Sequence, residues 1–355
     1  LWVANDGDRV QVYRNDTVNG QIQFLNIARE MSVDKSGAWM GFALGDFDGD
    51  ADLDIFVTNI GFNSLVRGRP SSAGGDCTYA HQFDWGTCFH YLLRNEGTAQ
   101  IEGLGTVGMF HDVAPSTPVK PSSVMPPASL DAGNIHETQQ VPTGLAAYDF
   151  GFGATFFDYD NDGNQDLYWL GSTIARGEGP GGQIFPSAGR MLRGDGQGGF
   201  EDITVEAHLL DIVGVDYSIL DTDDPRFNAL NQKITVTVHE NGKGLAHGDL
   251  NGDGYVDLIA TNSSGPVWDG TIESITPAPA PVFVWMNGGG DNHWITLRLK
   301  GRMAIDGTGS NADGIGARVY LKAGDKLLVQ EVRAGSSYLS MDSVELEFGL
   351  GGETQ

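Results

Sequence analysis

The chain of 355 residues carries 21 Lys and Arg against 47 Asp and Glu, which gives a formal net charge of -26. So negative a chain repels phosphate backbones, and this excludes nucleic acid as a first choice of partner. Glycine supplies 51 residues and hydrophobic residues supply 40% of the chain, which is typical of a turn-rich protein with a buried core. No apolar run reaches the roughly 18 residues of a membrane-spanning helix, so we expect no transmembrane segment.

One acidic pattern recurs three times, beginning at Asp46, Asp158 and Asp249. Each copy reads D-x-[DN]-x-D-x-x-x-D, follows a short stretch that contains glycine, and leads into an apolar run. A single acidic turn is often only a solvated hairpin, but three copies in the same frame indicate an internal repeat. The repeat explains part of the acidity, because its loops use 12 of the 47 acidic residues.

The spacing of the oxygen-bearing side chains suits a hard cation that takes six to eight oxygen ligands, as Ca²⁺ does. Position seven differs in chemistry between the copies, as expected if it contributes only its backbone carbonyl. About three bound Ca²⁺ ions would change the formal charge from -26 to about -20, so we expect folding and calcium binding to be coupled. The predicted metal ligands are Asp46, Asp48, Asp50, Asp52 and Asp54; Asp158, Asp160, Asp162, Asn164 and Asp166; and Asp249, Asn251, Asp253, Tyr255 and Asp257.

These loops differ from EF-hands, which place a Glu at position twelve between two helices. Position twelve is here Val57, Trp169 or Ala260, each inside a β-like run. We therefore predict calcium loops between strands. Position six, which must turn sharply, is glycine in the second and third copies but Ala51 in the first, so we expect strain or an altered geometry there.

Taken in chain order, the units read as calcium hairpin, strand, turn and strand. Residues 1–15 resemble the part of a unit that follows the acidic loop, so we expect one further motif upstream. The next unit runs from 46 to 97 and contains Cys77 and Cys88, which favour one loop-closing disulfide over two free thiols in an oxidising compartment. The units at 158–204 and 249–288 follow. Residues 60–90, 114–129 and 205–240 are either surface insertions or blades without a calcium loop.

The repeats resemble FG-GAP/VCBS repeats, the units of integrin-α-type β-propellers. The C-terminal stretch contains Asn292-His293-Trp294, Asp313-Gly314-Ile315-Gly316 and Glu331-Val332-Arg333-Ala334-Gly335-Ser336-Ser337, and it resembles the ASPIC/UnbV domain. This pairing is typical of the cartilage-acidic-protein-like group. The resemblance implies an all-β fold: a calcium-binding β-propeller, or a segment of one, over residues 1–290, then a small, truncated β domain over 291–355.

We expect a non-enzymatic binding or adhesion module in which Ca²⁺ rigidifies the Asp-rich loops. The resemblance implies that it is secreted, extracellular or on the cell surface, with a periplasmic location also compatible, and that it binds an extracellular protein or glycan. The alternative is a self-assembling extracellular subunit of a filament or surface array, since open sheet edges favour pairing with another chain. A glycan-active hydrolase is the least favoured hypothesis, because the acidic residues that form a pattern are explained as metal ligands and no histidine pair or nucleophile motif occurs.

Two further motifs are assigned structural roles. Arg193-Gly194-Asp195 has the letters of an integrin-binding tripeptide, but it falls where the other repeats have a turn, so we predict a turn. His247 precedes the third loop at a position that is apolar in the other repeats, so we predict that it packs in the core.

Overall fold

The computed structural model describes residues 1–60, 90–123, 144–148, 151–176, 183–187, 189–209, 241–263, 265–268, 275–278 and 281–354. In these ranges the protein is almost entirely β, as the sequence predicts, with one short α-helix (α1, Arg302–Asp306) and one 3-10 helix (Gly144–Ala147). Among the described residues, no helix is long and apolar enough to cross a membrane.

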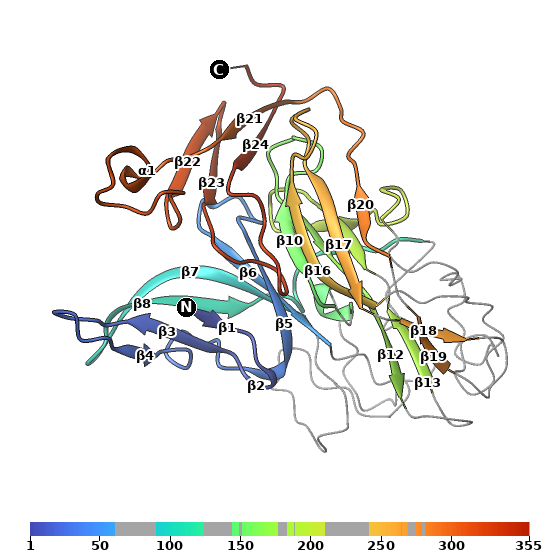
Figure 1. Ribbon diagram of the computed structural model, residues 1–355, viewed down its shortest axis with the longest axis horizontal. Helices are drawn as coiled ribbons and strands as arrows, with labels where there is room; N and C mark the ends of the chain where they lie inside the picture. Colours follow the sequence, from blue (N-terminus) through green and yellow to red (C-terminus); the bar gives the residue numbers. More distant parts are fainter. Residues whose placement is uncertain are drawn as a thin grey trace.

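Four sheets are arranged as blades (Figure 1). The first blade contains β1 (Trp2–Val3), β3 (Gln11–Asn15) and β4 (Phe24–Asn26). The second contains β2 (Asp6–Arg9), β5 (Ser36–Gly45), β6 (Asp54–Asn59), β7 (Tyr91–Ile101) and β8 (Gly105–Asp112). The third contains β10 (Ala154–Phe157), β11 (Asp166–Trp169), β14 (Arg190–Gly194), β15 (Phe200–Asp202) and β9 (Val119–Lys120). The fourth contains β16 (Asn241–Gly248), β17 (Asp257–Ser263) and β20 (Phe283–Trp285).

Within the second, third and fourth blades, the chain passes from an inner strand to the next strand through one acidic loop. Among these inner strands, β10 lies beside both β5 and β16. Two more hairpins extend from the third and fourth blades: β12 (Ser172–Arg176) with β13 (Gln183–Ser187), and β18 (Gly265–Trp268) with β19 (Ile275–Ala278).

Hydrophobic residues are buried between neighbouring blades. The strands that follow the acidic loops are covered on both faces, so they read as apolar runs rather than as an alternation. In β6, Ile55 and Val57 belong to the core shared with the first blade, whereas Phe56 faces the third. In β11, Trp169 faces the second blade and Tyr168 faces the fourth. Each of these blades thus buries apolar faces against its neighbours.

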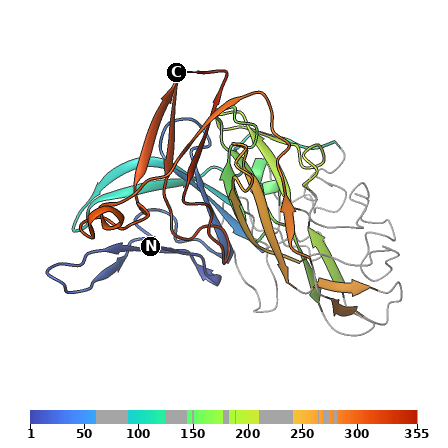
Figure 2. The same ribbon diagram turned by 45° about the horizontal axis from the view of Figure 1, so that its top comes forward.

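A small β domain follows the fourth blade. It pairs β21 (His293–Leu297) with β24 (Leu346–Gly351) and β22 (Arg318–Ala323) with β23 (Lys326–Glu331), around a core that includes Val332, Leu346 and Phe348. The chain between β23 and β24 descends between the second and third blades (Figure 2). The C-terminal domain is therefore seated beside the acidic loops.

Candidate metal loops

The three acidic loops lie where the sequence places them. They join β5 to β6, β10 to β11 and β16 to β17, and we call them loops one (46–54), two (158–166) and three (249–257). Position twelve falls in β6, β11 and β17 respectively. The prediction of loops between strands, in place of EF-hand loops between helices, is confirmed.

All three loops share an unusual backbone conformation at positions four and six. Position four has a positive φ in each loop: Gly49 at 76°, Asn161 at 58° and Gly252 at 77°. Position six has φ of 86° in loops two and three, where it is glycine, and Ala51 adopts 66° in loop one. The sequence predicted strain or an altered geometry at Ala51. The prediction of an altered geometry is wrong, because Ala51 adopts the left-handed conformation of the glycines at this position.

The first aspartate of each loop closes the loop through its own carboxylate. In loop two, Asp158 accepts the N–H of Asp162 at Oδ1 (3.0 Å) and the N–H of Gly163 at Oδ2 (2.7 Å). Asp46 and Asp249 accept the N–H groups of the residues four and five positions further on in the same way. A carboxylate has about four lone-pair sites, so each of these oxygens can still bind a cation.

The ninth aspartate ties the loop to the rest of its blade. Asp166 accepts the N–H of Tyr159 inside loop two at 2.9 Å and the N–H of Gly194 at the end of β14 at 2.8 Å. Asp54 bonds to Phe47 and Asn95, and Asp257 to Leu250 and Asn287, in the same two ways. These three carboxylates are buried, so they have a structural role as well as being candidate ligands.

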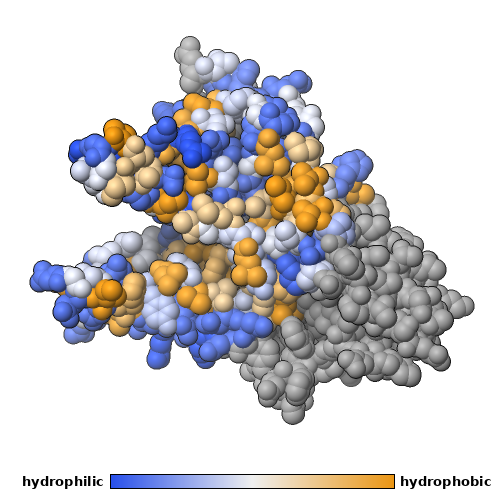
Figure 3. Space-filling view, viewed as in Figure 1, coloured by the Kyte–Doolittle hydropathy of each residue, from blue (hydrophilic) through white to orange (hydrophobic). Residues whose placement is uncertain are grey.

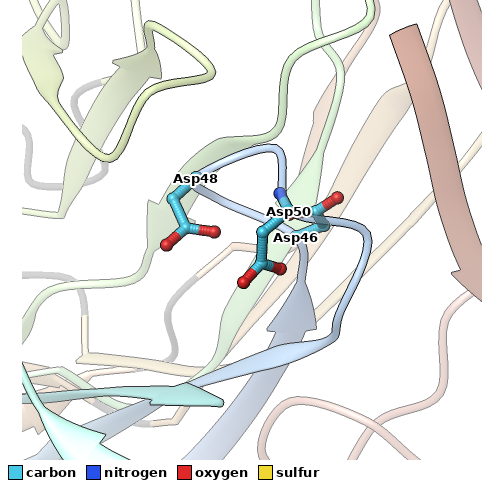
Figure 4. Close-up of side chains that lie close together, drawn as sticks. All are labelled: Asp46, Asp48 and Asp50. Atoms are coloured by element: carbon cyan, nitrogen blue, oxygen red, sulfur yellow. The ribbon is translucent and has the colours of Figure 1, made fainter. Parts of the chain in front are cut away.

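Carboxylate oxygens gather closely in loops one and two. One oxygen each from Asp46, Asp48 and Asp50 lies within 4.8 Å of the other two, and the same holds for Asp158, Asp160 and Asp166. The side chains of Asp48 and Asp50 reach to the same side of loop one (Figure 4). Oδ1 of Asp48 is buried and has no hydrogen-bond partner. The cluster thus consists of carboxylate oxygens, one of which is buried without a hydrogen-bond partner. Oxygen ligands of this kind fit a hard cation such as Ca²⁺.

Burial raises the pKa of several carboxyl groups in loops one and two, and neighbouring carboxylates raise it further. The pKa of Asp46 rises to about 6 and that of Asp54 to about 8, chiefly through burial. In loop two the pKa values of Asp158 and Asp166 are raised for the same reason, each also through the charge of the other loop acids. Without a cation, these carboxyl groups are therefore harder to ionise than carboxyl groups in water.

Loop three has fewer charges, because Asn251 replaces the aspartate at position three. The Asn251 amide donates to Asp253, whose Oδ1 accepts the N–H of Tyr255 at 2.9 Å. The hydroxyl of Tyr255 donates to the carbonyl of Asn292 at 3.2 Å. The Tyr255 hydroxyl is thus engaged outside the loop, and the expectation that position seven offers only its carbonyl to a cation stays a prediction.

Two other expectations receive different outcomes. Asp195 accepts the N–H groups of Gln197 and Gly199 at 2.8 Å in a turn, so the prediction of a turn is confirmed. The expected disulfide between Cys77 and Cys88 lies outside the described residues. Most of the segments expected to be insertions or additional blades also lie outside them.

The prediction for His247 is correct for burial but incomplete. The His247 side chain is 9% exposed, its Nδ1 lies 2.6 Å from Thr155 Oγ1 and 3.2 Å from Asp342 Oδ1, and its backbone N–H donates to Asp342. Burial lowers the pKa of His247, but the Asp342 carboxylate outweighs that effect and raises it. The partner lies 95 residues further along the chain, and nothing in the sequence around His247 points to it.

Comparison with known families agrees with this architecture. The family model described as FG-GAP-like repeat matches residues 1–57, the FG-GAP repeat model matches 241–272, and the ASPIC and UnbV model matches 307–355. No curated protein matches the chain. The chain thus combines segments that match FG-GAP repeats and fold as β-propeller blades with a segment at 307–355 that matches the ASPIC and UnbV domain.

Proposed function

We propose that this protein is a non-enzymatic binding or adhesion module of the extracellular space or cell surface, in which Ca²⁺ at loops one, two and three rigidifies the blades. FG-GAP repeats support the coarse assignment, because they build propeller-type binding modules. One observation carries the calcium assignment: the same carboxylate scaffold recurs in all three loops and leaves an unpaired buried oxygen at Asp48.

The electrostatics of the loops support the same assignment. Carboxylates whose oxygens lie within 4.8 Å of one another, as in loops one and two, repel when ionised. A bound divalent cation removes that repulsion and favours the ionised form, so its binding energy adds to the free energy of folding. We expect the cation to hold the loop backbone through Asp46, Asp158 and Asp249 and to hold each loop to its blade through the ninth aspartates.

Thermal unfolding tests the calcium assignment. The protein is stripped with chelator, and its melting temperature is measured in chelator, in millimolar Ca²⁺ and in millimolar Mg²⁺. We expect Ca²⁺ to raise the melting temperature strongly and Mg²⁺ to raise it less, because Mg²⁺ demands a tighter octahedral shell. Equal melting temperatures in chelator and in Ca²⁺ would rule the assignment out.

Self-assembly is the second candidate function, and one observation favours it. Strand β20 lies at the edge of the fourth blade among the described residues. Along this edge Val282, Val284 and Met286 are 61%, 53% and 50% exposed. An exposed apolar edge strand is open to pairing with another chain.

Light scattering separates the two functions. A particle mass equal to one chain in Ca²⁺ supports the binding module, and the exposed edge then becomes a place to search for its ligand. If the parent protein forms large particles and the Val284→Lys variant does not, self-assembly through β20 is supported, since a charge on an edge strand blocks such pairing.

A further inference from the structure

The C-terminal domain reaches the inner strands of three blades through one inserted segment, residues 333–343. The N–H of Ser337 donates to the carbonyl of Phe42 in β5 at 2.8 Å, and its Oγ accepts the N–H of Ala154 in β10 at 3.1 Å. The N–H of Ser343 donates to the carbonyl of His247 in β16 at 2.9 Å. The segment thus joins three blades whose described inner strands are adjacent to one another through β10.

Polar and aromatic side chains fix this inserted segment. Arg333 donates to the carbonyl of Leu44 at 2.8 Å. The Tyr338 ring packs edge-on against Phe152, with centroids 5.1 Å apart. The outer part of the C-terminal domain stands clear of the first blade, with a hollow between them (Figure 3). The docking is therefore concentrated at the inner strands and at the acidic loops beside them.

Strand β24 lies directly on loop two. The N–H of Gly351 donates to the carbonyl of Asn161 at 2.8 Å. A Cβ at Gly349 would lie 2.1 Å from Oδ2 of Asp158, so only glycine fits there. Lys326 of β23 donates from Nζ to the carbonyl of Asp162 at 2.9 Å and to Oδ1 of Asn164 at 2.8 Å.

Loop three contacts the beginning of the same domain. The Trp294 ring lies so close to Gly254 that a Cβ there would meet it at 1.7 Å. The Asn292 amide donates to the carbonyl of Asp160 in loop two at 2.9 Å. The two loops are also joined to each other, because the Asn161 amide donates to the carbonyl of Gly254 at 2.9 Å.

Loop one has a different neighbour. A Cβ at Gly49 would lie 2.8 Å from the carbonyl of Gly196, in the turn between β14 and β15. Among the described residues, no hydrogen bond joins residues 46–54 to the C-terminal domain. Loop one therefore serves as an internal control for the other two.

We propose that loops two and three form a cation-dependent seat for the C-terminal domain, so that divalent-cation occupancy of these two loops, and not of loop one, holds the domain on the blades. This inference rests on the calcium binding proposed above. The carbonyls and glycines that hold the domain belong to the loop backbone that a bound cation would fix. Mutual repulsion of the uncompensated carboxylates would move the same backbone. Coupling of this kind is reciprocal, so docking must also raise the affinity of these loops for the cation.

Hydrogen exchange on the full-length chain tests the forward coupling. The position-five variants Asp50→Asn, Asp162→Asn and Asp253→Asn form a matched set, because each aspartate accepts the N–H two residues further on and asparagine can keep that bond. With Ca²⁺ as the probe, amide exchange in residues 333–351 should accelerate in Asp162→Asn and Asp253→Asn and remain unchanged in Asp50→Asn. Chelator should accelerate it in the parent protein.

A glycine pair tests the reverse coupling. Gly349→Ala pushes β24 away from loop two, whereas Gly352→Ala adds a Cβ to open space. By calorimetric Ca²⁺ titration, Gly349→Ala should weaken at least one site by about five-fold or more, and Gly352→Ala should leave all sites unchanged.

The outcomes separate this inference from the calcium proposal. No Ca²⁺ binding to the parent protein would overturn both. Calcium binding with unchanged exchange in residues 333–351, or equal effects of all three position-five variants, would overturn the seat alone. If Gly349→Ala does not fold, the position-five set still decides the question.

Discussion

At the residue scale, Ala51 shows how the loop conformation overrides residue preference. Its φ of 66° is left-handed, as at Gly163 and Gly254 at the same position of the other loops. A residue with a Cβ pays roughly 1–2 kcal/mol in this conformation. Loop one keeps the geometry, so the hydrogen bonds that Gly49, Asp50 and Ala51 donate to Asp46 must outweigh that strain.

Ala51→Gly is therefore expected to stabilise the protein. Removing the Cβ relieves the left-handed strain and should raise the free energy of unfolding by about 1 kcal/mol. Gly163→Ala at the equivalent position, with φ of 86°, should lower it by a similar amount. Urea denaturation in Ca²⁺ measures both, and a destabilised Ala51→Gly variant would contradict this account of position six.

His90 makes the interface between the second and third blades sensitive to acid. It is completely buried, its Nδ1 accepts the N–H of Asn59 at 3.0 Å, and its ring packs edge-on against Phe56 and Trp169. Burial lowers the pKa of His90 to about 3. The unfolded chain therefore takes up a proton near pH 6.5 that the folded chain refuses, and stability falls as the pH drops from 6.5 towards 3.

His90→Asn removes this titration while keeping an acceptor near the N–H of Asn59. The variant should be less stable at pH 7, because it leaves a cavity beside Trp169. Between pH 7 and pH 5, however, the parent protein should lose about 2 kcal/mol more than the variant. Denaturant unfolding at the two pH values measures the difference, and parallel losses would show that His90 does not control the acid response.

At the scale of the element, each acidic loop is both a candidate metal site and a structural turn. Asp158 and Asp249 close their loops by accepting backbone N–H groups, which stabilises the turn independently of any role as a ligand. A simple loss of stability on mutation would therefore not reveal a metal. The change in the calcium effect is the informative quantity.

Asp158→Ala and Asp249→Ala should both lower the melting temperature in Ca²⁺ and reduce the difference between Ca²⁺ and chelator. When Ca²⁺ is at about 100 times its Kd, each lost site removes about 2.7 kcal/mol of stabilisation. Asp195→Ala is the control, since Asp195 also accepts two N–H groups in a turn but belongs to no acidic loop. If all three variants show the parent's calcium effect, the ligand assignment is wrong.

The elements were predictable where local pattern determines them. The apolar runs after the loops identified β6, β11 and β17, because strands buried on both faces are continuously hydrophobic. The spacing of the aspartates likewise identified the loops. The dual role of Asp54, Asp166 and Asp257 was not predictable, because their second hydrogen-bond partner lies about 30 to 40 residues away in another strand.

At the scale of the whole molecule, the blades are held by cores between neighbours and by one segment that crosses them. The family resemblance indicated a propeller and a C-terminal domain, but not how the two meet. That contact depends on pairs such as Arg333 with Leu44, which are 289 residues apart, and on close approaches at Gly349 and Gly254. A glycine that is required by tertiary contact looks in the sequence like any other glycine in a chain with 51 of them.

Calcium stoichiometry tests the central claim most directly. The full-length protein is stripped with chelator, dialysed to equilibrium against Ca²⁺ at micromolar to millimolar concentrations, and assayed for bound metal. The three loops predict saturation at three Ca²⁺ per chain, falling to two in Asp249→Ala. If no Ca²⁺ is bound at millimolar concentration, or if Asp249→Ala binds as many ions as the parent protein, the assignment of loops one, two and three as calcium sites is contradicted.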